Sequence, residues 1–183
     1  MLPFFFIPNK NRLFLLYSMI QGFTETNITA DICTEDNRIN TSVASTQIQF
    51  LVKFINDLDG SVSYCYPSYG FSLKIFPRYT EMIFIRAPAP ENVDFYRGEI
   101  HLLPAGHWKY EVYEVSWIGT VVVASGTAPA TEIDVLPVAD NNGVVQGIVT
   151  KGILNLTEKA GTEQVQFKSY TTTAGTNTIY YGQ

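Results

Sequence analysis

The chain has 183 residues, a net charge of -5, and 46% hydrophobic but only 16% charged residues. The length fits one domain with arms, and the apolar content is enough to bury a core, which excludes wholesale disorder. The twelve Lys and Arg residues are spread without a basic face, so nucleic acid is not expected as the main partner, and no sequence-specific binding to it is expected.

The first twenty residues are unusually apolar. Pro3 and Pro8 interrupt the segment, and Lys10 and Arg12 place two positive charges in its middle. A membrane-spanning helix needs about 20 predominantly apolar residues, so no span is expected here. A signal peptide is the alternative; we interpret the segment as a retained hydrophobic arm that docks on another protein. The residues expected to make this contact are Phe4, Phe5, Phe6, Ile7, Leu13, Phe14, Leu15 and Leu16.

A polar stretch, residues 22–45, follows the arm and predicts an extended connector with little helix. From residue 46 the side chains alternate between apolar and polar, as in strands with one buried face. The organisation that we expect is therefore an arm and connector over 1–45, a core over 46–137, and a C-terminal hairpin and tail strand over 138–183.

The core begins with a predicted hairpin. A first strand starts at residue 46, Asp57–Gly60 supplies turn residues, and residues 62–66 alternate as its partner. A third short run lies around residues 71–75. Residues 79–86 are apolar on both faces, which predicts a central strand. The predicted buried face of the first strand consists of Ile48, Phe50, Val52 and Phe54.

Further strands are predicted in the second half of the core. A short strand at 99–103 and a longer one at 108–117 are separated by the turn Pro104-Ala105-Gly106. The β-branched runs at 118–124 and 132–138 predict two more. On the longer strand, one face is expected to enter the core with Trp108, Tyr110 and Val112.

The C-terminal part continues the β pattern. A long strand is predicted over 144–156, where Gly147 and Gly152 mark bulges or bends. Residues 163–169 are predicted to run back as its hairpin partner, and 178–181 as a last strand. Because no helical periodicity extends over three turns after residue 21, the predicted fold class is all-β: an antiparallel, immunoglobulin-like β-sandwich with an extended N-terminal arm.

The sequence contains no constellation that identifies a chemistry. His101 and His107 flank one turn but make an incomplete metal site. Glu114 is interpreted as a strand-end carboxylate bonded to backbone amides. Cys33 and Cys65 are interpreted as two idle thiols, because a disulfide framework usually has more cysteines. No catalytic residue, cofactor or metal is therefore expected.

One stretch carries a resemblance. Residues 98–114 read G-x-I-x-L-x-P-x-G-x-W-x-Y-x-V-Y-E. Together with FLVKFINDLDGSVSYCY at 50–66 and RYTEMIFI at 78–85, this pattern resembles a module of neck and tail structural proteins from tailed bacteriophages, crAss-like phages and related marine phages. The resemblance covers residues 50–126. It implies a β-sandwich in a virion, and a ring-type head-to-tail connector, neck or tail component.

Composition agrees with a subunit of a large assembly. Charged residues are 16%, against roughly 25% in an average soluble domain, and aromatic residues are 14%. The expected partners are identical subunits in a ring and other virion proteins such as a portal or tail protein. The alternative is a secreted or cell-surface β-sandwich that binds carbohydrate or protein. An enzyme is not expected.

Overall fold

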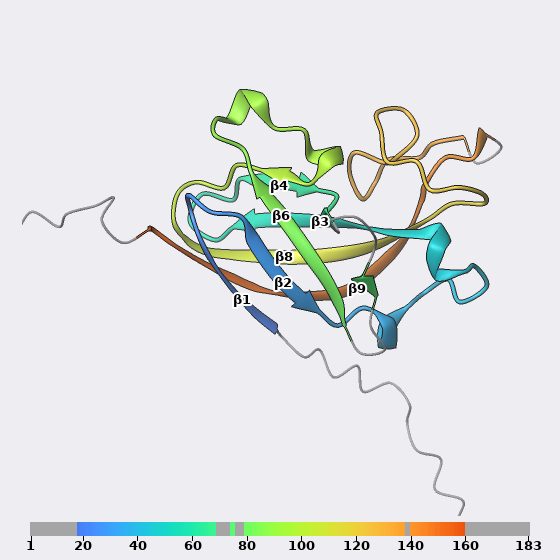
Figure 1. Ribbon diagram of the computed structural model, residues 1–183, viewed down its shortest axis with the longest axis horizontal. Coiled ribbons are helices and arrows are strands. Elements are labelled where there is room, and N and C mark those ends of the chain that lie inside the picture. The colour runs from blue at the N-terminus through green and yellow to red at the C-terminus, as the bar shows by residue number, and fades with distance from the viewer. Residues whose placement is uncertain (1–17, 69–73, 76–78, 138–139, 160–183) are drawn as a thin grey trace, which may run out of the picture.

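The structure, a computed structural model, describes residues 18–68, 74–75, 79–137 and 140–159 (Figure 1). Nearly all of its regular structure is β. The strands are β1 (Ser18–Phe23), β2 (Ile28–Ile32), β3 (Ile48–Asn56), β4 (Val62–Cys65), β5 (Lys74–Ile75), β6 (Thr80–Arg86), β7 (Glu99–Ile100), β8 (Gly106–Ser116) and β9 (Val144–Thr157). Four short 3-10 helices are η1 (Glu35–Asn37), η2 (Ser45–Gln47), η3 (Pro90–Asn92) and η4 (Phe95–Arg97).

The larger sheet has five strands in the order β1-β9-β8-β3-β4. The hairpin of β3 and β4 has the predicted turn at residues 57–60, and β8 pairs antiparallel with both β3 and β9. Two register shifts interrupt the β8–β9 ladder beside Gly147, whose φ of 140° suits glycine. Gly152 lies in regular register opposite Tyr110.

The smaller sheet is built around β6, as its apolar faces predict. β2 pairs antiparallel with one edge of β6. On the other edge, β5 pairs with the start of β6 and β7 pairs with its end. Figure 1 shows β2 and β6 crossing in front of β8 and β9, so the two sheets form facing layers.

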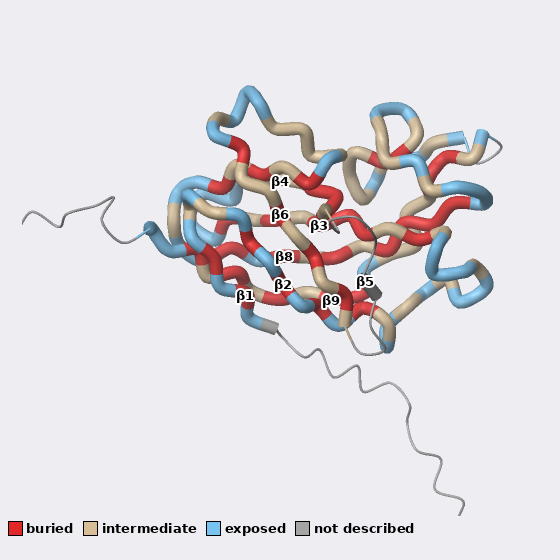
Figure 2. The backbone as a smooth tube through the Cα atoms, viewed as in Figure 1, coloured by how far each residue is buried: buried red, intermediate tan, exposed pale blue. Residues whose placement is uncertain are grey.

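The main core lies between the two sheets, where buried residues of both gather (Figure 2). Trp108, Tyr110 and Val112 belong to this core and are 2%, 0% and 0% exposed. The ring of Phe54 meets that of Phe84 edge to face, with centroids 5.2 Å apart. The face of β8 that the sequence alternation predicts to be buried therefore packs into the core between the two sheets.

The sheets are mixed, although the sequence predicts antiparallel pairing throughout. β1 pairs parallel with β9, and β7 pairs parallel with β6. The expected connector, residues 22–45, in fact contains the end of β1 and all of β2. Residues 28–32 form a strand because Ile28, Ala30 and Ile32 alternate with polar residues and are buried in the core. Strands from the arm, core and C-terminal segments thus share sheets.

Two predicted strands are absent. In the structure, residues 118–124 and 132–137 belong to the long loop between β8 and β9. Val121 and Val123 pack against the larger sheet without pairing in it, whereas Ile133 and Val135 are exposed. The predicted strands at 163–169 and 178–181 lie outside the described residues. Over residues 152–156, β9 is already paired on both edges, by β1 and β8.

Candidate interaction surface

The outer face of the larger sheet is divided into a covered and an uncovered half. The loop between β8 and β9 lies over the half near Ser116, where it closes a second, smaller core. Within this core, Tyr66 donates a hydrogen bond from its hydroxyl to the Pro129 carbonyl at 2.8 Å. The buried members are Leu51, Tyr66, Val115, Trp117 and Ala128.

Glu132 holds the margin of this loop on the sheet. Its Oε1 lies 2.5 Å from Lys53 Nζ, and its Oε2 accepts a hydrogen bond of 2.5 Å from the Tyr64 hydroxyl. Burial opposes ionisation of Glu132, but these hydrogen bonds bring its pKa below the ordinary value. Burial, followed by the bond to Glu132, raises the pKa of Tyr64. The three groups form a charge-assisted latch across β3, β4 and the loop.

Replacing Glu132 with glutamine should weaken this latch. Because the ion pair is only partly exposed, we expect Glu132→Gln to lower the free energy of unfolding by about 1–2 kcal/mol at pH 7. A carboxyl with a lowered folded-state pKa stabilises at neutral pH and loses that effect as the pH falls through this pKa. The difference between variant and wild type in urea unfolding should therefore start to shrink as the pH falls below about 4.3, the ordinary pKa of a glutamate, and continue to shrink at lower pH. A difference that is the same at pH 7 and pH 3 would contradict the latch.

The uncovered half begins beyond the latch. One row of side chains, directly opposite one another across all five strands, points outward there. Val62 is 48% exposed and Met19 is 62% exposed, and the isoleucines between them are half-buried. The row consists of Val62, Ile55, Lys109, Ile153 and Met19. It forms an apolar stripe with one lysine, and we call this row and the pocket beside it the open face.

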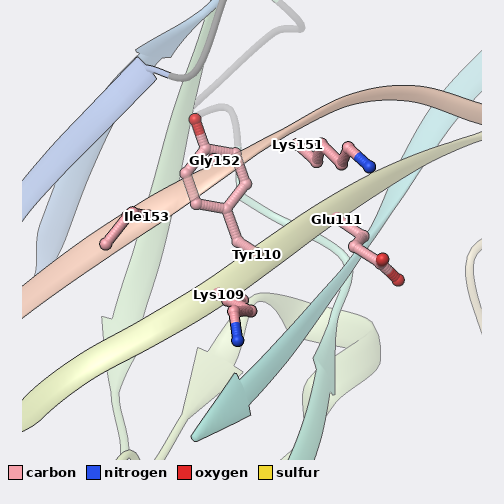
Figure 3. A pocket seen from close by; sticks show the side chains of 6 residues that line it. All are labelled: Lys109, Tyr110, Glu111, Lys151, Gly152 and Ile153. Atoms are coloured by element: carbon pink, nitrogen blue, oxygen red, sulfur yellow. The ribbon is translucent and has the colours of Figure 1, made fainter. Parts of the chain in front are cut away.

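A pocket of about 240 Å³ lies in the open face between β8 and β9 (Figure 3). Its outward side chains are Lys109, Glu111, Lys151 and Ile153, with Tyr110 and Gly152 completing the lining. The Tyr110 ring and the Lys109 side chain leave β8 in opposite directions, because neighbouring residues of a strand alternate in direction.

Charges around the pocket are largely balanced. Lys109 Nζ forms an ion pair of 2.5 Å with Asp57, and Glu111 accepts a hydrogen bond from the Tyr113 hydroxyl at 2.7 Å. Lys151 lies directly opposite Glu111 across the sheet. The open face is therefore close to neutral and suits an apolar partner.

Glu114 is an interior anchor. It is 0% exposed, and its two carboxylate oxygens accept hydrogen bonds from the backbone amides of Ile39 and Asn40 at 2.9 and 2.8 Å. These amides belong to the segment that crosses from β2 in the smaller sheet to β3 in the larger one. The carboxylate has the backbone-bonded environment that the sequence suggests, and it ties this crossover to β8.

The two histidines do not form a joint site in the structure. His101 Nδ1 lies 3.1 Å from the Ala87 carbonyl oxygen, whereas His107 is exposed at the start of β8. Within the described ranges, no three His, Cys, Asp or Glu side chains are grouped to hold a metal ion. Cys33 is exposed and Cys65 is buried, both as free thiols, and burial raises the pKa of Cys65.

The arm residues chosen from the sequence, Phe4–Ile7 and Leu13–Leu16, lie outside the described residues. Sequence reasoning missed the open face, although alternation along β3, β8 and β9 indicates which side chains point outward. Among the residues that the structure describes, no helix is long and apolar enough to cross a membrane.

These features define an all-β protein with two facing mixed sheets and a partly uncovered outer face. Comparisons of the chain with known protein families, curated proteins and solved structures find no match.

Proposed function

We propose that the chain is a non-enzymatic structural subunit of a tailed-bacteriophage virion, a ring-forming head-to-tail connector, neck or tail component. The open face carries this proposal, because an apolar row on a sheet face indicates a surface that a partner covers. The low charge of the chain, its apolar first segment and the resemblance over residues 50–126 support it.

The two facing sheets support a β-sandwich as the fold of such a subunit. We infer an immunoglobulin-like arrangement in which the antiparallel strands β9, β8 and β3 form the centre of one layer. The parallel pairs at β1 and β7 are additions at the ends of the two layers.

A ring needs two different contact surfaces on each subunit, because its contacts join unlike faces. The outer surfaces of the two sheets do differ. The larger sheet presents the near-neutral apolar row of the open face, whereas the smaller sheet has charged residues in register, with Glu81 of β6 opposite Asp31 of β2 and Lys74 of β5. This asymmetry favours a head-to-tail contact over a symmetric dimer.

Quantitative mass spectrometry of purified phage particles tests the proposal. We expect the chain to be present in several copies per particle, with an N-terminus that still contains residues 1–17. A chain that is absent from particles, is secreted without its first 20 or so residues and binds glycans as a monomer would support the alternative, a secreted or cell-surface binding protein.

A further inference from the structure

We infer that the open face is the docking site for the N-terminal segment, residues 1–17, of a neighbouring copy of the chain. This inference rests on the proposed subunit function and names the contact that joins the copies. The open face consists of described residues of β1, β3, β4, β8 and β9. The properties of the N-terminal segment that matter here are its length and its amino-acid composition.

The shape of the open face fits a side-chain anchor. Its pocket, of about 240 Å³, is smaller than the roughly 300–1,000 Å³ typical of small-molecule sites. Gly152 and its partner Tyr110 face the core, so the pocket is bounded by the outward side chains on either side of them, and the apolar row continues beyond it in both directions. A pocket of this size within an apolar row matches the buried aromatic anchors that dominate protein interfaces.

The chemistry of the pocket selects an aromatic occupant. Lys109 and Lys151 stand at its rim with Ile153 beside them. Ammonium groups are attracted to the faces of aromatic rings, and lysine stems cover apolar surface. The N-terminal segment has four phenylalanines, Phe4, Phe5, Phe6 and Phe14, among its 17 residues. The C-terminal residues 160–183 also carry aromatic side chains (Phe167, Tyr170, Tyr180 and Tyr181), but their other residues are mostly small and polar. They fit the apolar row less well than the N-terminal segment, whose aromatic residues stand among leucines and Ile7.

The direction of β1 favours a neighbouring copy over the same chain. Ser18 lies opposite Gly152, level with the pocket, and β1 runs from there toward Phe23. The row crosses the strands, whereas the chain enters β1 at Ser18 along the strand direction. Phe6 is twelve residues before Ser18, so at roughly 3.3 Å per residue the intervening chain can span up to about 40 Å. We infer that this length carries Phe6 onto an adjacent copy.

Photo-crosslinking of the full chain tests the inference. Phe6 is replaced by p-benzoyl-phenylalanine in an unlabelled chain, which is mixed with ¹⁵N-labelled wild-type chain and irradiated. We expect cross-linked peptides that join residue 6 of the unlabelled chain to Lys109–Glu111 or Lys151–Ile153 of the labelled chain. Cross-links confined to one chain, or directed to the loop at 117–137 or to residues 160–183, would overturn the inference, as would their absence.

Matched variants of the labelled chain locate the contact. Ile153→Glu places a charge in the row and should lower the yield of these cross-links at least about tenfold, since burying one such side chain is worth about 1.5–3 kcal/mol. Ile133→Glu is the control, because Ile133 is 81% exposed on the loop, away from the row. Lys151→Ala provides a second, milder change if Ile153→Glu proves unfolded by circular dichroism. An unchanged yield in folded variants at both positions would refute the docking site.

The same experiment separates this inference from the function on which it rests. If the copies associate but residue 6 cross-links elsewhere, the docking site is wrong and the subunit function stands. If the copies never associate, both proposals fail.

Discussion

Replacing Trp108 with alanine is expected to unfold the protein or nearly so. The side chain is 2% exposed in the core between the sheets, and its Nε1 donates a hydrogen bond of 3.1 Å to the Pro104 carbonyl. Truncating a buried tryptophan costs about 3–5 kcal/mol, a large part of the roughly 5–15 kcal/mol that stabilises a typical domain. Urea unfolding followed by circular dichroism measures the loss.

Lys109→Ala is the matched control for Trp108→Ala. It changes the next residue of β8, whose side chain points outward and is 62% exposed. We expect its midpoint in urea to stay close to that of the wild type. If Trp108→Ala folds normally and only weakens association between copies, the inner and outer faces of β8 have been assigned the wrong way round.

Glu114→Ala is expected to have the second largest effect. The substitution leaves the amides of Ile39 and Asn40 without their acceptor and opens a cavity beside β8. Because the two donors are only partly buried, each should cost about 1–2 kcal/mol when left unsatisfied, so we expect a total loss of about 2–4 kcal/mol in the free energy of unfolding.

Glu111→Ala is the comparison for Glu114→Ala, because it removes a carboxylate from the same strand on the outer face. It should cost less than about 1 kcal/mol, since its hydrogen bond with Tyr113 is partly exposed to water. Hydrogen exchange should also show faster opening of the Ile39 and Asn40 amides in Glu114→Ala. Equal losses in the two variants would contradict the anchoring role of Glu114.

Much of the larger sheet was predictable from local alternation. The β3–β4 hairpin, the long strand β8 and the central position of β6 follow from period-two patterns and turn residues. β2 was missed, although the sequence ITADI at 28–32 alternates, because the polar residues around it suggest a connector. Strands were predicted at 118–124 and 132–138 because of their β-branched residues, but such residues can pack on a sheet face without pairing in it, as Val121 and Val123 do.

The open face could not be predicted from the sequence, because its residues come together only through the pairing of distant strands. Its members Met19, Ile55, Lys109 and Ile153 are far apart in the sequence, and only the register of four strand pairs brings them into one row. The parallel pairing of β1 with β9 is the least predictable part, because nothing local in residues 18–23 specifies a partner more than 100 residues away.

The structure also moves the boundary of the arm. Residues 18–23 form β1, and Ile20 is 7% exposed in the core, so a deletion of residues 1–21 would remove part of a sheet. The deletion that separates assembly from folding is therefore residues 1–17.

Sedimentation velocity of the full chain beside this deletion variant tests the central claim most directly. We expect the full chain to sediment as a closed ring of one size, and the variant to be folded but monomeric. Loss of folding in the variant would mean that the segment belongs to its own domain. A full chain that remains a monodisperse monomer at high concentration would contradict a ring-forming structural subunit.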